Sequence, residues 1–409
     1  MKTIRTPFRA ALVASCFLAP GAFAASDAPA APGSIADAFS KGKVSLNVRA
    51  RYEGVDQTGL KEADANTMRT RLGFTTAPVN GLKATIEAEN ITALDGDRYS
   101  QAGLNPGGAG RAVVADPEGT EINQAFLAYS TGKSTFAAGR QRLVLDNARF
   151  VGDVGWRQNA QTFDAVSIVD KSIEKLSLTY GYLHQINRVF GDRHVQGDFE
   201  SDSHVLNASY GGLPIGTLTG YAYLLDFDNA AVNSSATYGL SLAGAVPLSQ
   251  QVKLSYRAEY ATQSDYGSSP LSYSTDYMLG ELGLGGKPGL IAAGYELLGT
   301  DNNVGFKTPL ATLHAFNGWA DAFLATPGGG LRDAYAKLSA NLPGGIGLLA
   351  FYHDFETDTG VALGKEWDVQ LTRKFGRYFT GLAKYAKFER DSLTLPNVKK
   401  VWLGVEFNY

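Results

Sequence analysis

Residues 252–260 read VKLSYRAEY, and this stretch decides the fold. Apolar and polar side chains alternate along it, so that Leu254 and Tyr256 point one way while Lys253 and Arg257 point the other. A period of two residues is the period of a β-strand. A strand with one apolar face and one charged face fits the wall of a membrane barrel, where lipid lies outside and water inside.

The same alternation recurs along the chain, for example as LNVRARYE at 46–53, LKATIEAE at 82–89 and VWLGVEFNY at 401–409. Short turns alternate with long connections, which we place at about 93–119, 147–160, 188–201, 264–274 and 300–330. This rhythm predicts an all-β protein, a transmembrane antiparallel up-and-down β-barrel of about 18 strands with short periplasmic turns and long extracellular loops. A barrel of that width leaves room for an aqueous channel.

The N-terminus has the features of a secretory signal peptide. A basic start precedes an apolar run over residues 10–19 and the small-residue site Ala22–Ala24. A lipoprotein-type cleavage at Cys16 would leave the apolar run too short. We therefore expect a signal peptide at 1–24, a short periplasmic segment at 25–43 and the barrel at 44–409, in the outer membrane of a Gram-negative bacterium. The aromatic C-terminal strand is typical of substrates of the barrel assembly machinery.

Composition excludes several classes of function. Cys16, the one cysteine, lies in the predicted signal peptide, so no disulfide or thiolate metal site is expected. A net charge of −3 argues against a nucleic-acid partner. The five histidines show no metal-ligand spacing, and no nucleophile-elbow motif is present. We expect no cofactor, no metal and no enzymatic activity. Acidic loop residues such as Asp95 and Asp192 could bind Ca²⁺, although solvated loop charge explains them as well.

Basic residues recur on the predicted lumen face. Rings of arginine or lysine inside a pore attract anions, and guanidinium groups bind carboxylates through two hydrogen bonds. The alternative is that arginine–carboxylate ladders only stiffen the wall. The candidate pore-lining residues are Arg49, Arg51, Arg69, Arg71, Arg140, Arg142, Arg149, Arg157, Asp164, Arg257, Lys337 and Lys384.

The connection at residues 147–159, which reads NARFVGDVGWRQN, is unusually apolar for an exposed loop. Its Phe150, Val154 and Trp156 side chains require burial. A loop that folds into the barrel as a constriction, narrowest near Arg140 and Arg157, would bury them. The alternative is an external loop packed on its neighbours.

A family resemblance rests on three segments. Residues 139–165, which include the runs GRQR and GWRQN, resemble the alginate-export family of outer-membrane proteins, as do residues 68–74 and 307–321. The resemblance implies an 18-stranded monomeric barrel that exports a polyanion through an arginine-rich pore, with a periplasmic export partner. The positions that match the family's pore are Arg71, Arg140, Arg157 and Asp164.

Two functions follow from these observations. The first is an outer-membrane channel for anionic solutes, either an alginate-export-like exporter of anionic saccharides or a related porin for small organic anions. The second is a structural or surface-binding barrel that acts through its extracellular loops. In both cases, membrane lipid and lipopolysaccharide surround the wall.

Overall fold

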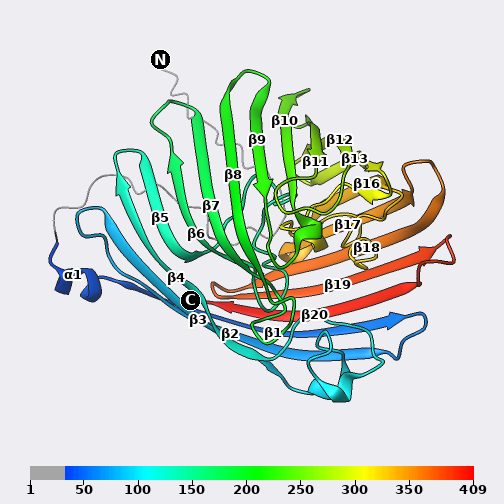
Figure 1. Ribbon diagram of the computed structural model, residues 1–409, viewed down its shortest axis with the longest axis horizontal. Helices are drawn as coiled ribbons and strands as arrows, with labels where there is room; N and C mark the ends of the chain where they lie inside the picture. Colours follow the sequence, from blue (N-terminus) through cyan, green and yellow to red (C-terminus); the bar gives the residue numbers. More distant parts are fainter. Residues whose placement is uncertain (1–32) are drawn as a thin grey trace.

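A computed structural model describes residues 33–409, so the predicted signal peptide and residues 25–32 lie outside the described part of the chain. Within it, 18 strands form one closed antiparallel sheet, and two further short strands form a hairpin in a loop (Figure 1). The strands of the sheet are β1 (Lys43–Gln57), β2 (Ala63–Thr75), β3 (Leu82–Ala93), β4 (Gly119–Thr131), β5 (Ser134–Gln141), β6 (Thr162–Asp170), β7 (Leu176–Asn187), β8 (Asp198–Leu213), β9 (Gly216–Leu225), β10 (Ser235–Pro247), β11 (Lys253–Ser264), β12 (Ser274–Gly286), β13 (Gly289–Leu298), β16 (Leu331–Leu342), β17 (Ile346–Glu356), β18 (Ala362–Phe375), β19 (Phe379–Arg390) and β20 (Val398–Asn408).

Each strand of the sheet pairs with its neighbour in the chain, except that β13 pairs directly with β16. The barrel closes because β1 also pairs with β20, in a register that joins Asn47 to Asn408. The small hairpin of β14 (Thr300–Asp301) and β15 (Val304–Gly305) lies in the connection between β13 and β16. The predicted 18-stranded up-and-down barrel is confirmed.

The connections alternate in length as predicted. At one end of the barrel the turns are tight, as at 132–133, 214–215 and 287–288; at the other end they reach their greatest lengths at 94–118, 142–161 and 299–330. Helical structure is confined to a few turns: α1 (Ile35–Ser40) and the 3-10 segments η1 (Gly96–Arg98), η2 (Pro106–Gly108), η3 (Ala231–Asn233), η4 (Leu313–Ala315) and η5 (Pro343–Gly345). Among residues 33–409, no helix is long and apolar enough to cross a membrane.

The outer face of the barrel is an apolar belt. Leu240, Leu282 and Ile291 are 53%, 61% and 67% exposed. On β11 the predicted faces are confirmed, since Tyr260 is exposed whereas Glu259 is buried inside. A closed sheet satisfies its own backbone groups, and its apolar exterior is suited to lipid. The protein is therefore located in the outer membrane of a Gram-negative bacterium.

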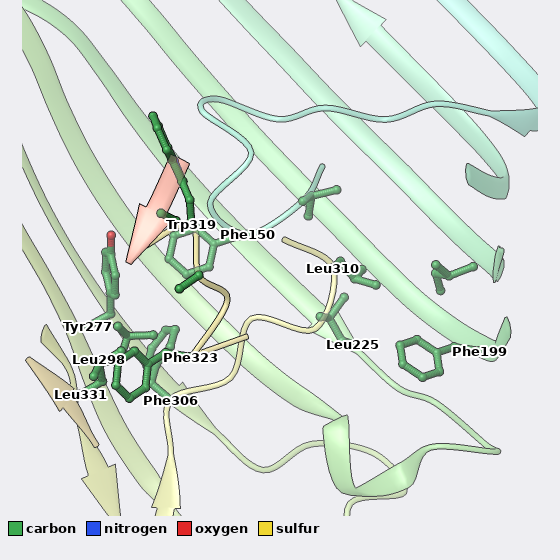
Figure 2. Close-up of a cluster of buried hydrophobic side chains, with 14 of the residues drawn as sticks. Phe150, Phe199, Leu225, Tyr277, Leu298, Phe306, Leu310, Trp319, Phe323 and Leu331 are labelled. Atoms are coloured by element: carbon green, nitrogen blue, oxygen red, sulfur yellow. The ribbon is translucent and has the colours of Figure 1, made fainter. Parts of the chain in front are cut away.

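The core lies inside the barrel, where two long loops fold inward. We call residues 142–161 the first inner loop and residues 306–330 the second inner loop. Figure 2 shows Phe150 of the first loop lying among Tyr277 of the wall and Phe306 of the second loop; the ring centroids of Phe150 lie 5.3 Å and 6.0 Å from theirs. The second loop also inserts Phe323, whose ring lies 4.7 Å from that of Phe355 on β17.

The belt predicts the effect of a charge on either face. Leu240→Arg places a guanidinium in lipid and should lower the free energy of unfolding by about 2–4 kcal/mol. Ser255→Arg places the same group on the lumen face of β11 and should change it by less than about 1 kcal/mol. Denaturant titration in lipid vesicles, followed by the mobility shift of the unfolded barrel on gels, measures both; equal losses would contradict the assigned faces.

Candidate transport site in the lumen

Arginines of β1 and β2 converge on one stretch of the first inner loop. Arg49 donates from Nε to the Gln158 side chain at 2.9 Å and from Nη1 to the Gly155 carbonyl at 3.0 Å. Arg51 donates to the Trp156 carbonyl at 2.5 Å, and Arg71 to the Gln158 carbonyl at 3.2 Å. Irregular backbone inside a protein must find hydrogen-bond partners. The strand arginines supply them and so fix the loop in the lumen.

Arg69 completes this group from the neighbouring position. It lies opposite Arg49 in the β1–β2 register and forms an ion pair with Glu406 of β20, with 3.3 Å between Nη2 and Oε1. Arg51 pairs with Asp116 of the β3–β4 loop, and Arg71 pairs with Glu89 of β3. Arg49 forms no direct ion pair within residues 33–409, although Glu406 is its partner in the β1–β20 register. The predicted arginine cluster is thus assembled at the lumen, where four arginines share three nearby carboxylates.

The arginines of the first inner loop itself have structural roles. Arg149 is buried, donates to Glu296 of β13 at 2.7 Å and lies over the Phe316 ring at 4.8 Å. Arg157 pairs with Glu53 of β1 at 2.9 Å and with Asp321 of the second loop at 3.2 Å. These contacts tie the loop to opposite sides of the barrel, so the predicted fold of this loop into the lumen is what the structure shows.

The two inner loops pair with each other through their backbones. Gly152 donates to the Leu310 carbonyl at 2.9 Å, and Thr312 donates to the Ala148 carbonyl at 3.0 Å. A Cβ on Gly152 would lie 2.3 Å from the Thr312 hydroxyl oxygen, so glycine is required for this approach. The Gln161 side chain donates to the carbonyls of both loops, at 2.8 Å and 3.1 Å. The loops therefore form one unit across the lumen.

Wall carboxylates hold the second inner loop by its amide groups. Glu366 and Asp368 of β18 accept from the backbone N–H groups of Ala320 and Trp319, at 2.6 Å and 3.1 Å. Glu296 accepts from the Asn317 side chain at 2.6 Å. The lumen thus has a basic wall on β1 and β2 and an acidic wall on β13 and β18.

The Lys384 side chain of β19 lies where both inner loops meet the barrel wall, and we call this contact the Lys384 centre. Its ammonium lies 4.2 Å, 3.6 Å and 5.4 Å from the ring centroids of Trp156, Trp319 and Trp402. These are three of the four tryptophans in the sequence, one from each inner loop and one from β20. A desolvated cation over aromatic faces is stabilised by about 2 kcal/mol or more. Lys384 therefore joins both loops to the wall.

A hydrogen-bonded chain extends from this centre through His314. Lys384 lies 2.7 Å from His314 Nε2, and His314 Nδ1 lies 2.7 Å from Asp321. Burial holds the pKa of the His314 imidazole well below its ordinary value, so it is neutral and accepts from the lysine. Burial would raise the pKa of Asp321, but His314, Lys400 and Arg157 outweigh it and hold that pKa well below its ordinary value.

The structure corrects the placement of Arg140 and Asp164. Both were predicted to line the pore, yet Arg140 shares the outward face of β5 with Phe136, and its register partner Asp164 shares that of β6 with Val166. The two form a bidentate ion pair, with distances of 2.7 Å and 2.9 Å. The charge-inside rule fails here because the pair lies near the long-loop end of its strands, where a charge on the outer face costs little. Arg157, unlike Arg140, therefore lies inside the barrel.

The remaining predicted residues lie on the lumen side without meeting at the loops' centre. Arg142 follows β5 and contacts Asp153 at 3.5 Å. Arg257 pairs with Glu259 on its own strand at 2.6 Å. Lys337 lies 4.0 Å from Glu281 and 5.7 Å from the Phe351 ring centroid. Arg142 thus belongs to the first inner loop, whereas Arg257 and Lys337 line the barrel wall.

Sequence reasoning singled out Trp156 but missed the roles of Trp319, Trp402, Asp116, His314 and Asp321. One signal was available for Trp402, because the alternation in residues 401–409 puts it on the same face as Glu406 and hence in the lumen. Trp319 and His314 lie in an irregular loop, where no period assigns a face. No group of His, Cys, Asp or Glu side chains in the described chain is arranged to hold a metal ion.

A small cavity lies against the first inner loop. Two N–H groups in its lining are buried and lack a hydrogen-bond partner within residues 33–409, namely Arg51 Nε and Trp156 Nε1. Such groups are rare, because burial of an N–H group costs desolvation energy that no hydrogen bond offsets. Its lining residues are Arg49, Arg51, Gly155, Trp156, Thr380, Leu382, Gly404, Val405 and Glu406.

Solved outer-membrane porins of the Occ/Opd group share this fold. OccAB2 of Acinetobacter baumannii matches with a TM-score of 0.72 at 15% identity, over 91% of this chain and 99% of that chain. OpdK of Pseudomonas aeruginosa, solved with vanillate, matches with the same TM-score, identity and coverage. OccD3 (OpdP) of that organism has a TM-score of 0.66 at 15% identity, over 90% and 91%. No protein-family model and no curated protein matches the sequence.

At this identity the comparisons establish the fold and not the family. They support an outer-membrane β-barrel, whereas the resemblance to the alginate-export family receives no specific support from them. The function must therefore be argued from the lumen itself.

The Lys384 centre leads to a prediction about the second inner loop. Lys384→Met removes the cation from the three rings and the donor from His314, so the free energy of opening this loop should fall by about 2 kcal/mol. Hydrogen–deuterium exchange of peptides from residues 306–330 should then be about thirtyfold faster. Lys337→Met, a lumen lysine without contact to the loop, is the matched control; unchanged exchange in the Lys384 variant would show that the centre does not hold the loop.

Proposed function

We propose that this protein is an outer-membrane channel that passes small anionic solutes, carboxylates above all, through an arginine-lined constriction. The observation that carries the proposal is the cavity beside Arg49, Arg51 and Trp156. A carboxylate placed there would lie beside the Arg49 and Arg51 side chains, and guanidinium groups bind carboxylates through two hydrogen bonds.

The charge balance at the constriction supports an anion over a cation. Four arginines (Arg49, Arg51, Arg69 and Arg71) face three nearby carboxylates, Asp116, Glu89 and Glu406, so one positive charge is left over. Basic groups that line a pore attract anions. The remaining positive charge therefore favours anion entry.

The packing of the inner loops favours a small solute over a polymer. Trp156 and Trp319 of the two inner loops meet Lys384 of the wall inside the barrel, so the loops occupy part of the lumen. Export of an alginate-like chain, the finer function implied by the family resemblance, would require both loops to leave the lumen. OpdK, a structural neighbour, was solved with vanillate, a small aromatic carboxylate.

The alternative of a surface-binding barrel fits the loops less well. A binding surface needs loops that project outward, whereas the first and second inner loops bury their apolar residues in the barrel, among them Phe150, Val151, Phe306 and Phe323. Loops that fold into the barrel in this way fit a channel better than a binding surface.

Arg49 tests the proposal by ion selectivity. Arg49→Gln keeps a side chain able to donate to the loop and removes the charge; loss of one unit charge near a passing ion weakens its attraction by about 1 kcal/mol in a water-filled path. The chloride-to-potassium permeability ratio, from reversal potentials in planar bilayers under a KCl gradient, should fall about fivefold, and benzoate should block less well.

Arg140→Gln is the matched control, because it removes the same charge from the outer wall. It should leave both measurements unchanged. A wild-type channel that prefers cations, or equal effects of the two substitutions, would overturn the proposed function.

A further inference from the structure

Helix α1 precedes the first strand and has two different faces. Residues four apart share a face of a helix, so Ile35 and Phe39 form an apolar stripe while Asp37 and Lys41 lie on the opposite side. The charged pair is bridged at 3.4 Å. Ser34 and Asp37 form a capping box that starts the helix, with hydrogen bonds of 3.0 Å and 3.2 Å. A six-residue helix needs such support, since short helices are unstable alone in water.

Contacts fix α1 against the outside of the barrel at its short-turn end. The carbonyl of Ala38 accepts from the Ala77 N–H of the β2–β3 turn at 2.9 Å, and Ala38 is the buried residue of the helix. Phe39 stacks on Phe74 of β2, with centroids 6.1 Å apart and planes 10° from parallel. Phe74 pairs in register with Val44, which is exposed on the outer face. Figure 1 shows α1 at the rim, clear of the lumen.

The apolar stripe of α1 continues the lipid-facing belt. Ile35 is 75% exposed and Phe39 61%, and beside them Val44 and Leu72 of the belt are 57% and 58% exposed. Exposed apolar side chains gathered at one edge of the belt mark an interaction surface. Phe39 stacks on Phe74, and Val44, Leu72 and Phe74 belong to the lipid-facing side of the barrel, so lipid also covers the apolar stripe of α1.

We propose that α1 is an interfacial anchor, with Ile35 and Phe39 inserted at the headgroup–acyl boundary of the periplasmic leaflet and Asp37 and Lys41 facing water. The short-turn end is periplasmic, so the leaflet is the phospholipid one. An amphipathic helix lies in the plane of such a boundary with its apolar face buried. Because β1 follows α1 directly and pairs with both β2 and β20, the anchor fixes the seam where the barrel closes relative to the membrane surface.

Spin labels test the orientation of α1, because the predicted mature chain has no cysteine of its own. Single variants Ile35→Cys, Phe39→Cys, Asp37→Cys and Lys41→Cys are labelled in the full barrel and reconstituted into phosphatidylethanolamine–phosphatidylglycerol vesicles. Collision rates with oxygen, which enriches in lipid, and with a water-soluble nickel chelate report depth. The oxygen-to-nickel ratio should be several-fold higher at 35 and 39 than at 37 and 41.

Equal ratios at the four positions, all typical of water, would overturn the anchor and assign the stripe to a protein partner, since the vesicles contain none. Because α1 lies outside the sheet, each variant should keep the gel mobility of the folded barrel. A label at Leu72→Cys marks the lipid value and one at Gly132→Cys, in a periplasmic turn, marks the water value. Variants at 35 and 39 that match Gly132→Cys overturn the proposal even if helix and barrel are intact.

Discussion

A chain segment can lie inside this barrel only if its backbone N–H and C=O groups find hydrogen-bond partners there. The segment 155–158 would carry several buried carbonyls, each costly if left without a donor. Arginines of β1 and β2 provide the donors, since a guanidinium offers five N–H groups in a fixed plane and can bind more than one carbonyl. The acidic wall answers the same need for the second inner loop, where amide groups of Trp319 and Ala320 require acceptors.

The two loops form one unit because each is held by a different wall of the barrel. Arginines of the basic wall hold the first inner loop, and carboxylates of the acidic wall hold the second, so each loop alone is attached on one side only. Their backbone pairing at Gly152 and Leu310 and the bridging Gln161 side chain join the halves. Lys384 then adds a cation shared among three rings, a contact that neither loop could make without the other. The two inner loops are therefore one cooperative unit.

Much of this could be predicted from the sequence, and the failures have physical causes. The alternation at 252–260 and the order of short and long connections were sufficient for the strand number and the outer face, because alternate residues of a strand lie on opposite faces and each connection separates two strands. The apolar residues Phe150 and Trp156 correctly indicated a loop that folds inward. Arg140 was misplaced because the rule that charges face the lumen weakens toward the strand ends. The Lys384 centre was out of reach, since its partners come from loops with no period and meet only through tertiary pairing.

In the proposed channel, the arginines that hold the loop would also attract the solute, and these two roles compete. A guanidinium matched by a carboxylate, as Arg71 is by Glu89, contributes shape with little remaining charge. The four arginines of β1 and β2 face only three nearby carboxylates, Asp116, Glu89 and Glu406, so one positive charge is left for an anion. A fourth acid at this wall would hold the scaffold more firmly and leave less attraction for an anion. The proposed selectivity therefore depends on incomplete neutralisation of the basic wall.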